Sequence, residues 1–171
     1  NMKNIDFIPV KDLAGRKFIV KDYQRGYKWE REQIFALLSD IFYHTTGKYC
    51  LQSLIVKSEG ESFELIDGQQ RITSIYLLNY FLTGNKFCEI DYQTRESTKE
   101  FLNENLNLLN ESLKITGDEF CRDNPTYDNV DVFHFFEVYD EIKKWFSIRT
   151  EEVKESIREK LNEIVHVIWY D

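Results

Sequence analysis

The sequence is poor in the residues that break a regular fold or cross-link it. Its 171 residues include only 7 Gly and 2 Pro, which argues against a low-complexity or disordered chain. The three Cys and three His are scattered, without the spacing of a disulfide framework or a zinc site. We therefore expect no zinc, and the separated, odd-numbered Cys favour a reducing, cytoplasmic compartment.

Long apolar runs and an excess of positive charge are also missing. No apolar run approaches the roughly 20 residues of a membrane helix, and the N-terminus lacks the apolar core of a signal peptide. Lys and Arg number 22 against 30 Asp and Glu, which gives a net charge of −8. Broad DNA binding depends on cationic side chains that neutralise phosphates. We therefore expect no membrane partner, and we assign any DNA contact to another domain.

What the sequence does have is apolar and aromatic material. Hydrophobic residues make up 42% and aromatic residues 15%, enough for the core of one domain of this length. Residues 18–20, 49–56 and 63–66 are β-prone, and the last two segments read as a hairpin. Residues 34–41 carry apolar side chains at helical spacing, and residues 72–82 are apolar nearly all round, as in a buried helix.

The second half of the sequence is mainly helical in its apolar spacing. One face runs through Leu102, Leu106, Leu109 and Leu113, and further helical patterns cover residues 132–146 and 150–164. Residues 118–128 read as a loop, and residues 165–170 are β-prone.

These patterns predict an α+β fold. We expect a small, mostly antiparallel sheet with flanking helices and a helical second half. Residues 1–171 are treated as a single domain, with a core in 1–96 and a mainly helical extension in 97–171 that ends in a strand. Ending on a strand suggests a piece of a longer protein.

The most informative segment runs Asp67-Gly68-Gln69-Gln70-Arg71, between a hydrophobic strand and a buried helix. The first turn of a helix carries unpaired N–H groups and partial positive charge, which suit a phosphate. Gly68 lets the backbone approach a ligand closely, and Arg71 can bind two phosphate oxygens. Gln69 and Gln70 suit a ribose, a base edge or an attacking water. Asp67 suits Mg²⁺.

The same residues also fit an ordinary turn. Asp-Gly turns are common, and Asp67 or Gln70 can cap a helix while Arg71 pairs with a surface acid. Spacing alone does not decide between the two. The position of four polar residues at the edge of a sheet favours a ligand site.

Five other side chains have both a functional and a structural interpretation. Gln24 and Arg25 either reach a base or phosphate at the same site, or pack among aromatic rings. Arg95 is either a second phosphate ligand or the partner of a nearby acid. Asp131 and His134 lie one helical turn apart, so they form either an acid–base pair or part of a cap or polar network.

The run from Asp67 to Thr73 resembles the signature of the N-terminal domain of GmrSD-type modification-dependent restriction enzymes. The similarity continues in Tyr23–Trp29, Ile90–Ser97, Asn129–His134 and Val167–Tyr170, and so covers nearly the whole chain. It implies a core in residues 1–96 related to ParB and sulfiredoxin, in which a Gly-rich turn ending in Arg holds nucleotide phosphates. Thr73 is counted among the phosphate-binding candidates on the same ground.

The resemblance also implies partners. A nucleoside triphosphate with Mg²⁺ would be the ligand, and an HNH-type nuclease domain or subunit would cut DNA. Modified phage DNA would be contacted through other domains. Relatives carry a further motif, Phe-x-Arg-Leu-Asn, after the final strand, and this sequence stops before it. This piece alone therefore either hydrolyses nucleotides or only binds them.

We rank three hypotheses. The first is a domain of a modification-dependent restriction and anti-phage defence system that binds and hydrolyses nucleoside triphosphates. Its catalytic residues would be Asp67, Gln70 and Arg71, followed by Asp131 and His134. The second is a non-catalytic sensor or interaction module for a nucleotide or modified DNA. The third and lowest is a ParB-like nuclease, because the spacing shows no metal-binding cluster of acids.

Overall fold

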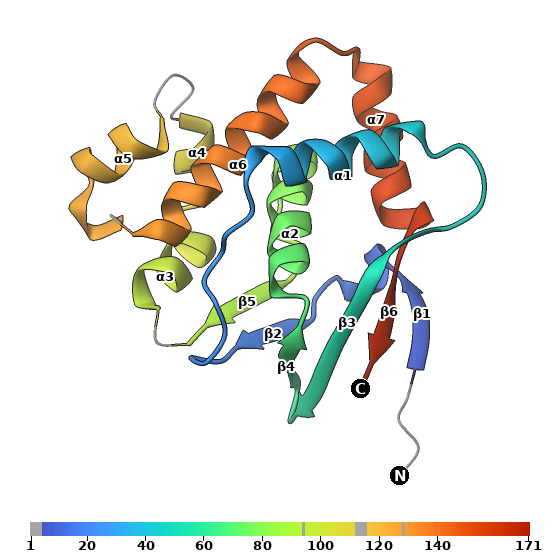
Figure 1. Ribbon diagram of the computed structural model, residues 1–171, viewed down its shortest axis with the longest axis horizontal. Coiled ribbons are helices and arrows are strands. Elements are labelled where there is room, and N and C mark those ends of the chain that lie inside the picture. The colour runs from blue at the N-terminus through green and yellow to red at the C-terminus, as the bar shows by residue number, and fades with distance from the viewer. Residues whose placement is uncertain (1–4, 94, 112–115, 128) are drawn as a thin grey trace.

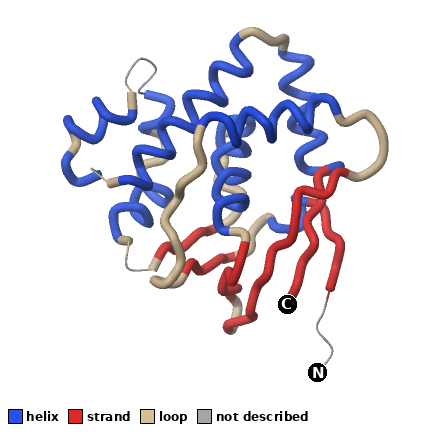
Figure 2. Tube along the Cα trace, in the orientation of Figure 1, coloured by secondary structure: helices blue, strands red, loops and turns tan. Residues whose placement is uncertain are grey.

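A computed structural model describes residues 5–93, 95–111, 116–127 and 129–171. The strands form one sheet on one side of the molecule, and the helices lie on the other (Figures 1 and 2). In the described residues the sheet has six strands in the order β1-β6-β3-β4-β2-β5. These are β1 (Ile5–Pro9), β2 (Lys17–Val20), β3 (Tyr49–Glu59), β4 (Ser62–Asp67), β5 (Glu89–Tyr92) and β6 (Val165–Tyr170).

The α+β class is confirmed, but the expectation of a mostly antiparallel sheet is wrong. The β3–β4 hairpin and the β1–β6 pair are antiparallel. By contrast, β2 runs parallel to β4 and to β5, and β3 runs parallel to β6. Parallel neighbours need crossover connections, which helical segments supply here. The relation of this core to the ParB and sulfiredoxin fold stays a prediction.

The helices with strong apolar spacing form where the sequence predicts them. They are α1 (Arg31–Tyr43), α2 (Gln69–Thr83), α6 (Val130–Ser147) and α7 (Glu151–Glu159). The side chains of Asn129 and Thr150 cap α6 and α7 by accepting hydrogen bonds from backbone N–H groups. A 3₁₀ turn, η1 (Val10–Leu13), precedes β2, and a π-helical turn, η3 (Lys160–Ile164), leads into β6. In the described part of the chain, no helix has the length and apolarity to cross a membrane.

Two helical details of the second half differ from the expectation. The leucine face is divided, because α3 (Glu96–Glu104) ends before α4 (Leu108–Glu111) begins, and Leu113 lies outside the described residues. The expected loop at 118–128 instead contains α5 (Gly117–Asp123) and a 3₁₀ turn, η2 (Pro125–Tyr127), while Asp128 is not described. Thr116 caps α5, because its hydroxyl accepts a hydrogen bond from the Glu119 N–H at 3.2 Å. A Thr at this position is a typical helix N-cap, and the loop prediction did not take it into account.

One hydrophobic core joins the two halves of the chain. The sheet presents buried side chains of β2, β4 and β6 to buried side chains of α1, α2 and α6. Strand β6 lies between β1 and β3, so the last described strand completes a sheet that the first part of the chain begins. Fully buried members of this core include Phe18, Leu65, Ile34, Tyr76 and Phe135.

Candidate functional site

The segments singled out in the sequence follow the carboxyl ends of three adjacent strands. Strands β4, β2 and β5 are neighbours and run in the same direction, so their carboxyl ends meet at one edge. Asp67 ends β4, residues 21–30 follow β2, and Arg95 comes three residues after β5. The carboxyl ends of parallel strands are a common place for ligands in α/β sheets. We call residues 21–30 the strap, because they cross the beginning of α2.

The turn between β4 and α2 is tighter than the sequence predicted. Helix α2 begins at Gln69 rather than near Arg71, and Gly68 is its N-cap with a φ of 107°. A side chain at this left-handed position is strained, and a Cβ there would collide with Leu54 Cδ2. Glycine is therefore required, and the backbone N–H groups of residues 69–71 lie in the first turn of the helix.

Asp67 and Arg71 lie on the two sides of this turn. Asp67 is exposed, and Arg71 is partly exposed. Within the described residues, neither side chain has a hydrogen bond or ion pair to the protein, and Asp67 does not cap α2. A carboxylate and a guanidinium therefore stand beside a helix N-terminus with their donors and acceptors available to a ligand.

Unlike Asp67 and Arg71, the Gln70 side chain is hydrogen-bonded within the protein. Its Oε1 accepts from the Lys28 N–H at 2.8 Å, and its Nε2 donates to the Gly26 carbonyl at 2.8 Å. Both ends of the amide therefore bind the backbone of the strap. Gln69, beside it, is buried.

Two further strap residues fix this segment to its surroundings. Gln24 Nε2 donates to the Ile66 carbonyl at 2.9 Å and to the Leu65 carbonyl at 3.3 Å, next to the turn. The buried Tyr27 hydroxyl is 2.8 Å from Ser74 Oγ on α2. Burial raises the pKa of Tyr27, so this hydroxyl stays protonated. The strap is thus tied to both β4 and α2, and no sequence pattern marked Tyr27 or Ser74 as its anchors.

Thr73 lies in the core and not at the edge. Its hydroxyl is fully buried, 2.7 Å from the hydroxyl of Tyr92 on β5. Burial raises the pKa of Tyr92, which keeps the pair as two neutral hydroxyls. In this arrangement Thr73 links α2 to β5 and has no path to solvent.

Arg95 and Asp131 are brought together, although 36 residues separate them. Arg95 Nη1 donates to Asp131 Oδ2 at 3.2 Å, and Thr98 Oγ1 donates to the same oxygen at 2.6 Å. Gly26 of the strap packs against both charged groups, and a Cβ on Gly26 would collide with Asp131 Oδ1. Sequence analysis missed the roles of Thr98 and Gly26, and only the position of Gly26 inside an aromatic segment hinted at a close approach.

His134 does not pair with Asp131 in the described structure. Its Nδ1 is 3.1 Å from the Trp29 carbonyl at the end of the strap, while Asp131 is engaged by Arg95 and Thr98. Each residue therefore contacts a different segment. An acid–base relay between them would need both to change partners.

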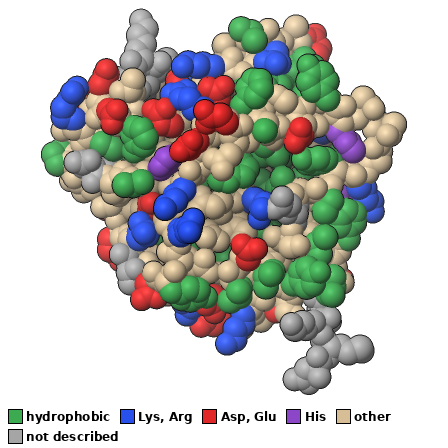
Figure 3. All heavy atoms as spheres, viewed as in Figure 1, with side chains coloured by type: hydrophobic (Ala, Val, Ile, Leu, Met, Phe, Trp, Pro, Cys, Tyr) green, Lys and Arg blue, Asp and Glu red, His purple; other side chains and the backbone are tan. Residues whose placement is uncertain are grey.

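Positive side chains gather at this edge although the chain as a whole is acidic. Figure 3 shows Lys and Arg side chains clustered over the segment between β2 and α1. The cationic residues on the turn, the strap and the segment after β5 are Lys21, Arg25, Lys28, Arg71 and Arg95. In the described structure, Lys21 pairs with Glu59 and Arg95 pairs with Asp131, while the other three side chains have no hydrogen bond or ion pair. Arg25, Lys28 and Arg71 are therefore unpaired positive charges on a chain that is acidic as a whole.

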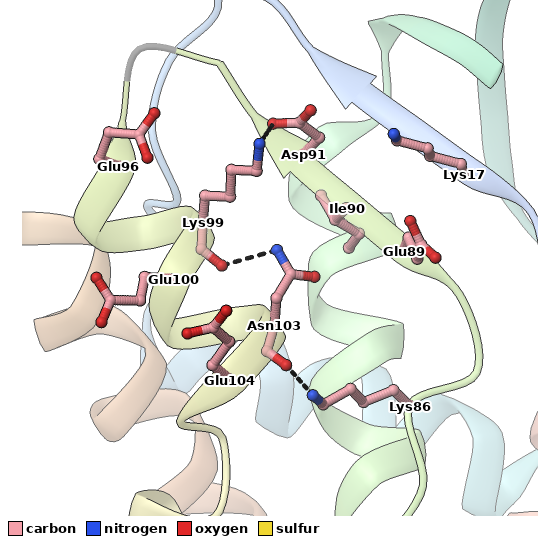
Figure 4. A pocket seen from close by; sticks show the side chains of 10 residues that line it. All are labelled: Lys17, Lys86, Glu89, Ile90, Asp91, Glu96, Lys99, Glu100, Asn103 and Glu104. Atoms are coloured by element: carbon pink, nitrogen blue, oxygen red, sulfur yellow. Dashed lines mark hydrogen bonds and ion pairs between the residues drawn. The ribbon is translucent and has the colours of Figure 1, made fainter.

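A separate hollow of about 690 Å³ lies between β5 and α3 (Figure 4). Lys99 pairs with Asp91 across it at 3.3 Å, and Lys86 donates to the Asn103 carbonyl. None of the residues from Asp67 to Thr73 lines it, although Ile90, Asp91 and Glu96 of the Ile90–Ser97 segment do. Its acidic residues outnumber its lysines and repel anions, so it suits a nucleotide less well than the edge; they are Glu89, Asp91, Glu96, Glu100 and Glu104.

The residues at the edge fit only one mode of metal binding. No group of three or more His, Cys, Asp or Glu side chains in the described part of the chain is arranged to hold an ion. Mg²⁺ bound with a nucleotide commonly takes one or two carboxylates and completes its shell with phosphates and water. The exposed Asp67 carboxylate fits that mode.

Fold and edge together define a mixed α+β domain whose motif residues gather at the carboxyl ends of parallel strands. The model of one protein family, the N-terminal domain of the GmrSD restriction endonuclease, matches residues 10–171. The chain belongs to this family, and its role therefore lies in a restriction endonuclease system. No curated protein matches the chain.

Proposed function

We propose that this domain binds the phosphates of a nucleoside triphosphate at the edge of β4, β2 and β5 and hydrolyses the nucleotide. The observation that carries this proposal is that the side chains of Asp67 and Arg71 have no protein partner in the described structure. An ordinary turn would have Asp67 capping α2 or Arg71 paired with an acid, and the described structure has neither contact. An unpaired arginine at a helix N-terminus suits a phosphate, and an unpaired carboxylate beside it suits the Mg²⁺ that accompanies a nucleotide.

The proposed chemistry divides among few groups. The N–H groups of residues 69–71 hold phosphate oxygens, and Arg71 neutralises the charge that grows as a phosphoryl group is transferred. Asp67 holds Mg²⁺ or orients the attacking water. Bound Mg²⁺ would supply a Lewis acid on the phosphates.

A second candidate function is a nucleotide or modified-DNA sensor without turnover. Gln70 favours it, because both ends of its amide already bind the strap, which leaves only one N–H and one acceptor lone pair to orient a water. On either view, DNA cleavage falls to an HNH-type nuclease domain or subunit. Modified DNA is contacted through other domains, because a net charge of −8 opposes broad DNA binding by this chain.

Titration of the chain with ATP, GTP, CTP and UTP in the presence of Mg²⁺ tests the proposal. We expect at least one nucleotide to bind, and Arg71→Ala to weaken binding about tenfold or more, because charge-assisted contacts to phosphate are lost. Release of phosphate would support hydrolysis, and binding without release would support the sensor.

Arg158→Ala is the matched control, because it removes one positive charge from α7, where Arg158 pairs with the neighbouring Glu155 and with no other acid among the described residues. Its nucleotide affinity should equal that of the wild type. Equal affinity of Arg71→Ala and wild type, or no binding of any nucleotide, would contradict the proposal.

A further inference from the structure

Asp131 is a buried carboxylate whose contacts lead to the proposed phosphate site. It lies in the first turn of α6 with 2% of its side chain exposed. Thr98 holds Oδ2 at 2.6 Å, and Arg95 Nη1 approaches both oxygens, at 3.2 and 3.4 Å. A buried charge without a partner is strongly disfavoured. Arg95 is therefore the neutralising partner that Asp131 needs.

Arg95 keeps most of its donors available. A guanidinium has five N–H donors, and Asp131 is contacted by Nη1 alone. In the described structure, Nη2 and Nε make no hydrogen bond, and 43% of the side chain is exposed. Arg95 is thus held at one nitrogen and open at the others.

Gly26 connects this pair to the beginning of α2. Its carbonyl accepts from Gln70 Nε2 at 2.8 Å, and a Cβ on it would lie 2.8 Å from Arg95 Nη1. Gly26 therefore contacts both the Arg95 guanidinium and the side chain of Gln70, a residue in the first turn of α2. Arg71 is the residue after Gln70 in that turn.

We propose that Asp131 is a positioning residue that holds Arg95 as a second phosphate-binding arginine, in addition to Arg71. The inference rests on the proposed function. Two arginines, one in the first turn of α2 and one joined to that turn through Gly26 and Gln70, match a chain of phosphates better than a single phosphate. His134, bound to the Trp29 carbonyl, has no part in this arrangement.

The test is a double-mutant cycle with inorganic tripolyphosphate as the probe, repeated with whichever nucleotide the wild type binds. We expect Arg95→Ala and Asp131→Asn each to weaken binding about tenfold. The double variant should bind no more weakly than Arg95→Ala, because Asp131 acts through Arg95. This non-additivity is a readout that a merely structural role for Asp131 would not produce.

Arg71→Ala and Arg158→Ala are measured alongside. If the wild type binds neither tripolyphosphate nor a nucleotide, the proposed function and this inference both fail. If Arg71→Ala weakens binding and Arg95→Ala does not, only this inference fails. A further loss when Asp131→Asn is added to Arg95→Ala would also overturn it.

Thr98→Val covers the case in which Asp131→Asn does not fold. It keeps the carboxylate but removes the hydroxyl that fixes Oδ2. We expect it to bind tripolyphosphate several-fold more weakly, with no further loss in the Arg95→Ala background. Unchanged binding by a folded Thr98→Val variant would then overturn the inference.

Discussion

Gln70 is the residue on which the shape of the edge depends most directly. Its amide donates to one strap residue and accepts from another, which fixes the strap over the first turn of α2. An amide side chain can do both at once, because it carries a donor and an acceptor on separate atoms. Glutamate has nearly the same shape but, when ionised, only accepts.

We predict that Gln70→Glu loosens the strap. Its carboxylate would face the Gly26 carbonyl with no proton to donate, which costs about 1–3 kcal/mol locally. Trypsin should then cleave after Arg25 and Lys28 several-fold faster, as followed by mass spectrometry.

Cleavage after Lys48, in the exposed loop between α1 and β3, serves as the internal control and should not change. Equal rates of strap cleavage in Gln70→Glu and wild type would show that the Gln70 amide does not hold the strap in place.

The positions of single residues at the edge were predictable where neighbouring residues in the sequence mark them. The strand–glycine–helix junction marked Gly68 and the neighbouring Arg71 without any knowledge of the fold. The partners of Gln70 lie 42 and 44 residues away, so no spacing shows them. The position of Thr73 was also not predictable. Helix α2 begins at Gln69, so Gln69 and Thr73, four residues apart, lie on the same buried face of the helix. Which residues of the motif are buried depends on where the helix begins, and that residue could not be read from the sequence.

At the scale of elements, an ion network joins the beginning of α1 to the middle of α6. Arg31 Nε lies 2.7 Å from Glu137 Oε2, and Arg31 Nη1 lies 2.8 Å from Asp140 Oδ2. Partial burial works against these charges, but their mutual hydrogen bonds outweigh it, raising the pKa of Arg31 and lowering that of Asp140. Because α1 follows the strap and α6 carries Asp131, this network fixes both supports of the edge.

We predict that Arg31→Ala destabilises the protein at neutral pH and much less in acid. The pKa of Asp140 is lower in the folded chain than in the unfolded one, so its contribution is present above its ordinary pKa. That contribution is lost as the pH falls through the lowered value. Urea unfolding should give a loss of about 1 kcal/mol at pH 7, discounted for solvent screening, and a smaller loss in acid, at a pH below the ordinary pKa of the Asp140 carboxyl.

The control for this comparison is Arg158→Ala, whose ion pair with Glu155 is exposed. It should change the free energy of unfolding little at pH 7. A loss for Arg31→Ala that is the same at both pH values would contradict the ionic explanation.

Helices and strands were predictable from the sequence where the apolar spacing within the segment itself marks them. The apolar spacing of α1 and α6 needs no partner to be visible, and their positions are confirmed. The direction in which two strands pair is not written in either strand, because it follows from how the intervening chain crosses the sheet. The parallel pairing of β2 with β4 and β5, which creates the edge, was missed for this reason.

At the scale of the whole molecule, β6 holds the sheet together. It pairs with β1 on one side and β3 on the other, and Val165, Val167 and Trp169 are buried in the core. The sequence predicted a strand at 165–170 but not its position between two strands from the other end of the chain. No local pattern joins Ile5 to Tyr170, which face each other across β1 and β6.

We predict that a chain lacking residues 165–170 does not fold cooperatively, because β1 loses its partner in the sheet and the core loses its Trp169 side. Circular dichroism and thermal unfolding should show no sharp transition. Asp171→Ala, an exposed change just after β6 that removes hydrogen bonds to Ser58, should keep a sharp transition with a small shift in the melting temperature. A cooperative transition in the shortened chain would mean that the remaining strands form a sheet without β6.

The central place of β6 also bears on the order of events during protein synthesis. Strands β1 and β3 are synthesised early, but they do not pair with each other. The strand that lies between them in the sheet, β6, consists of residues 165–170 and is synthesised last. Pairings between such distant segments form slowly, since the long intervening loop must first be closed. We therefore expect the edge at the ends of β4, β2 and β5 to form only in a fully translated domain, so that a prematurely terminated chain would lack the proposed nucleotide site.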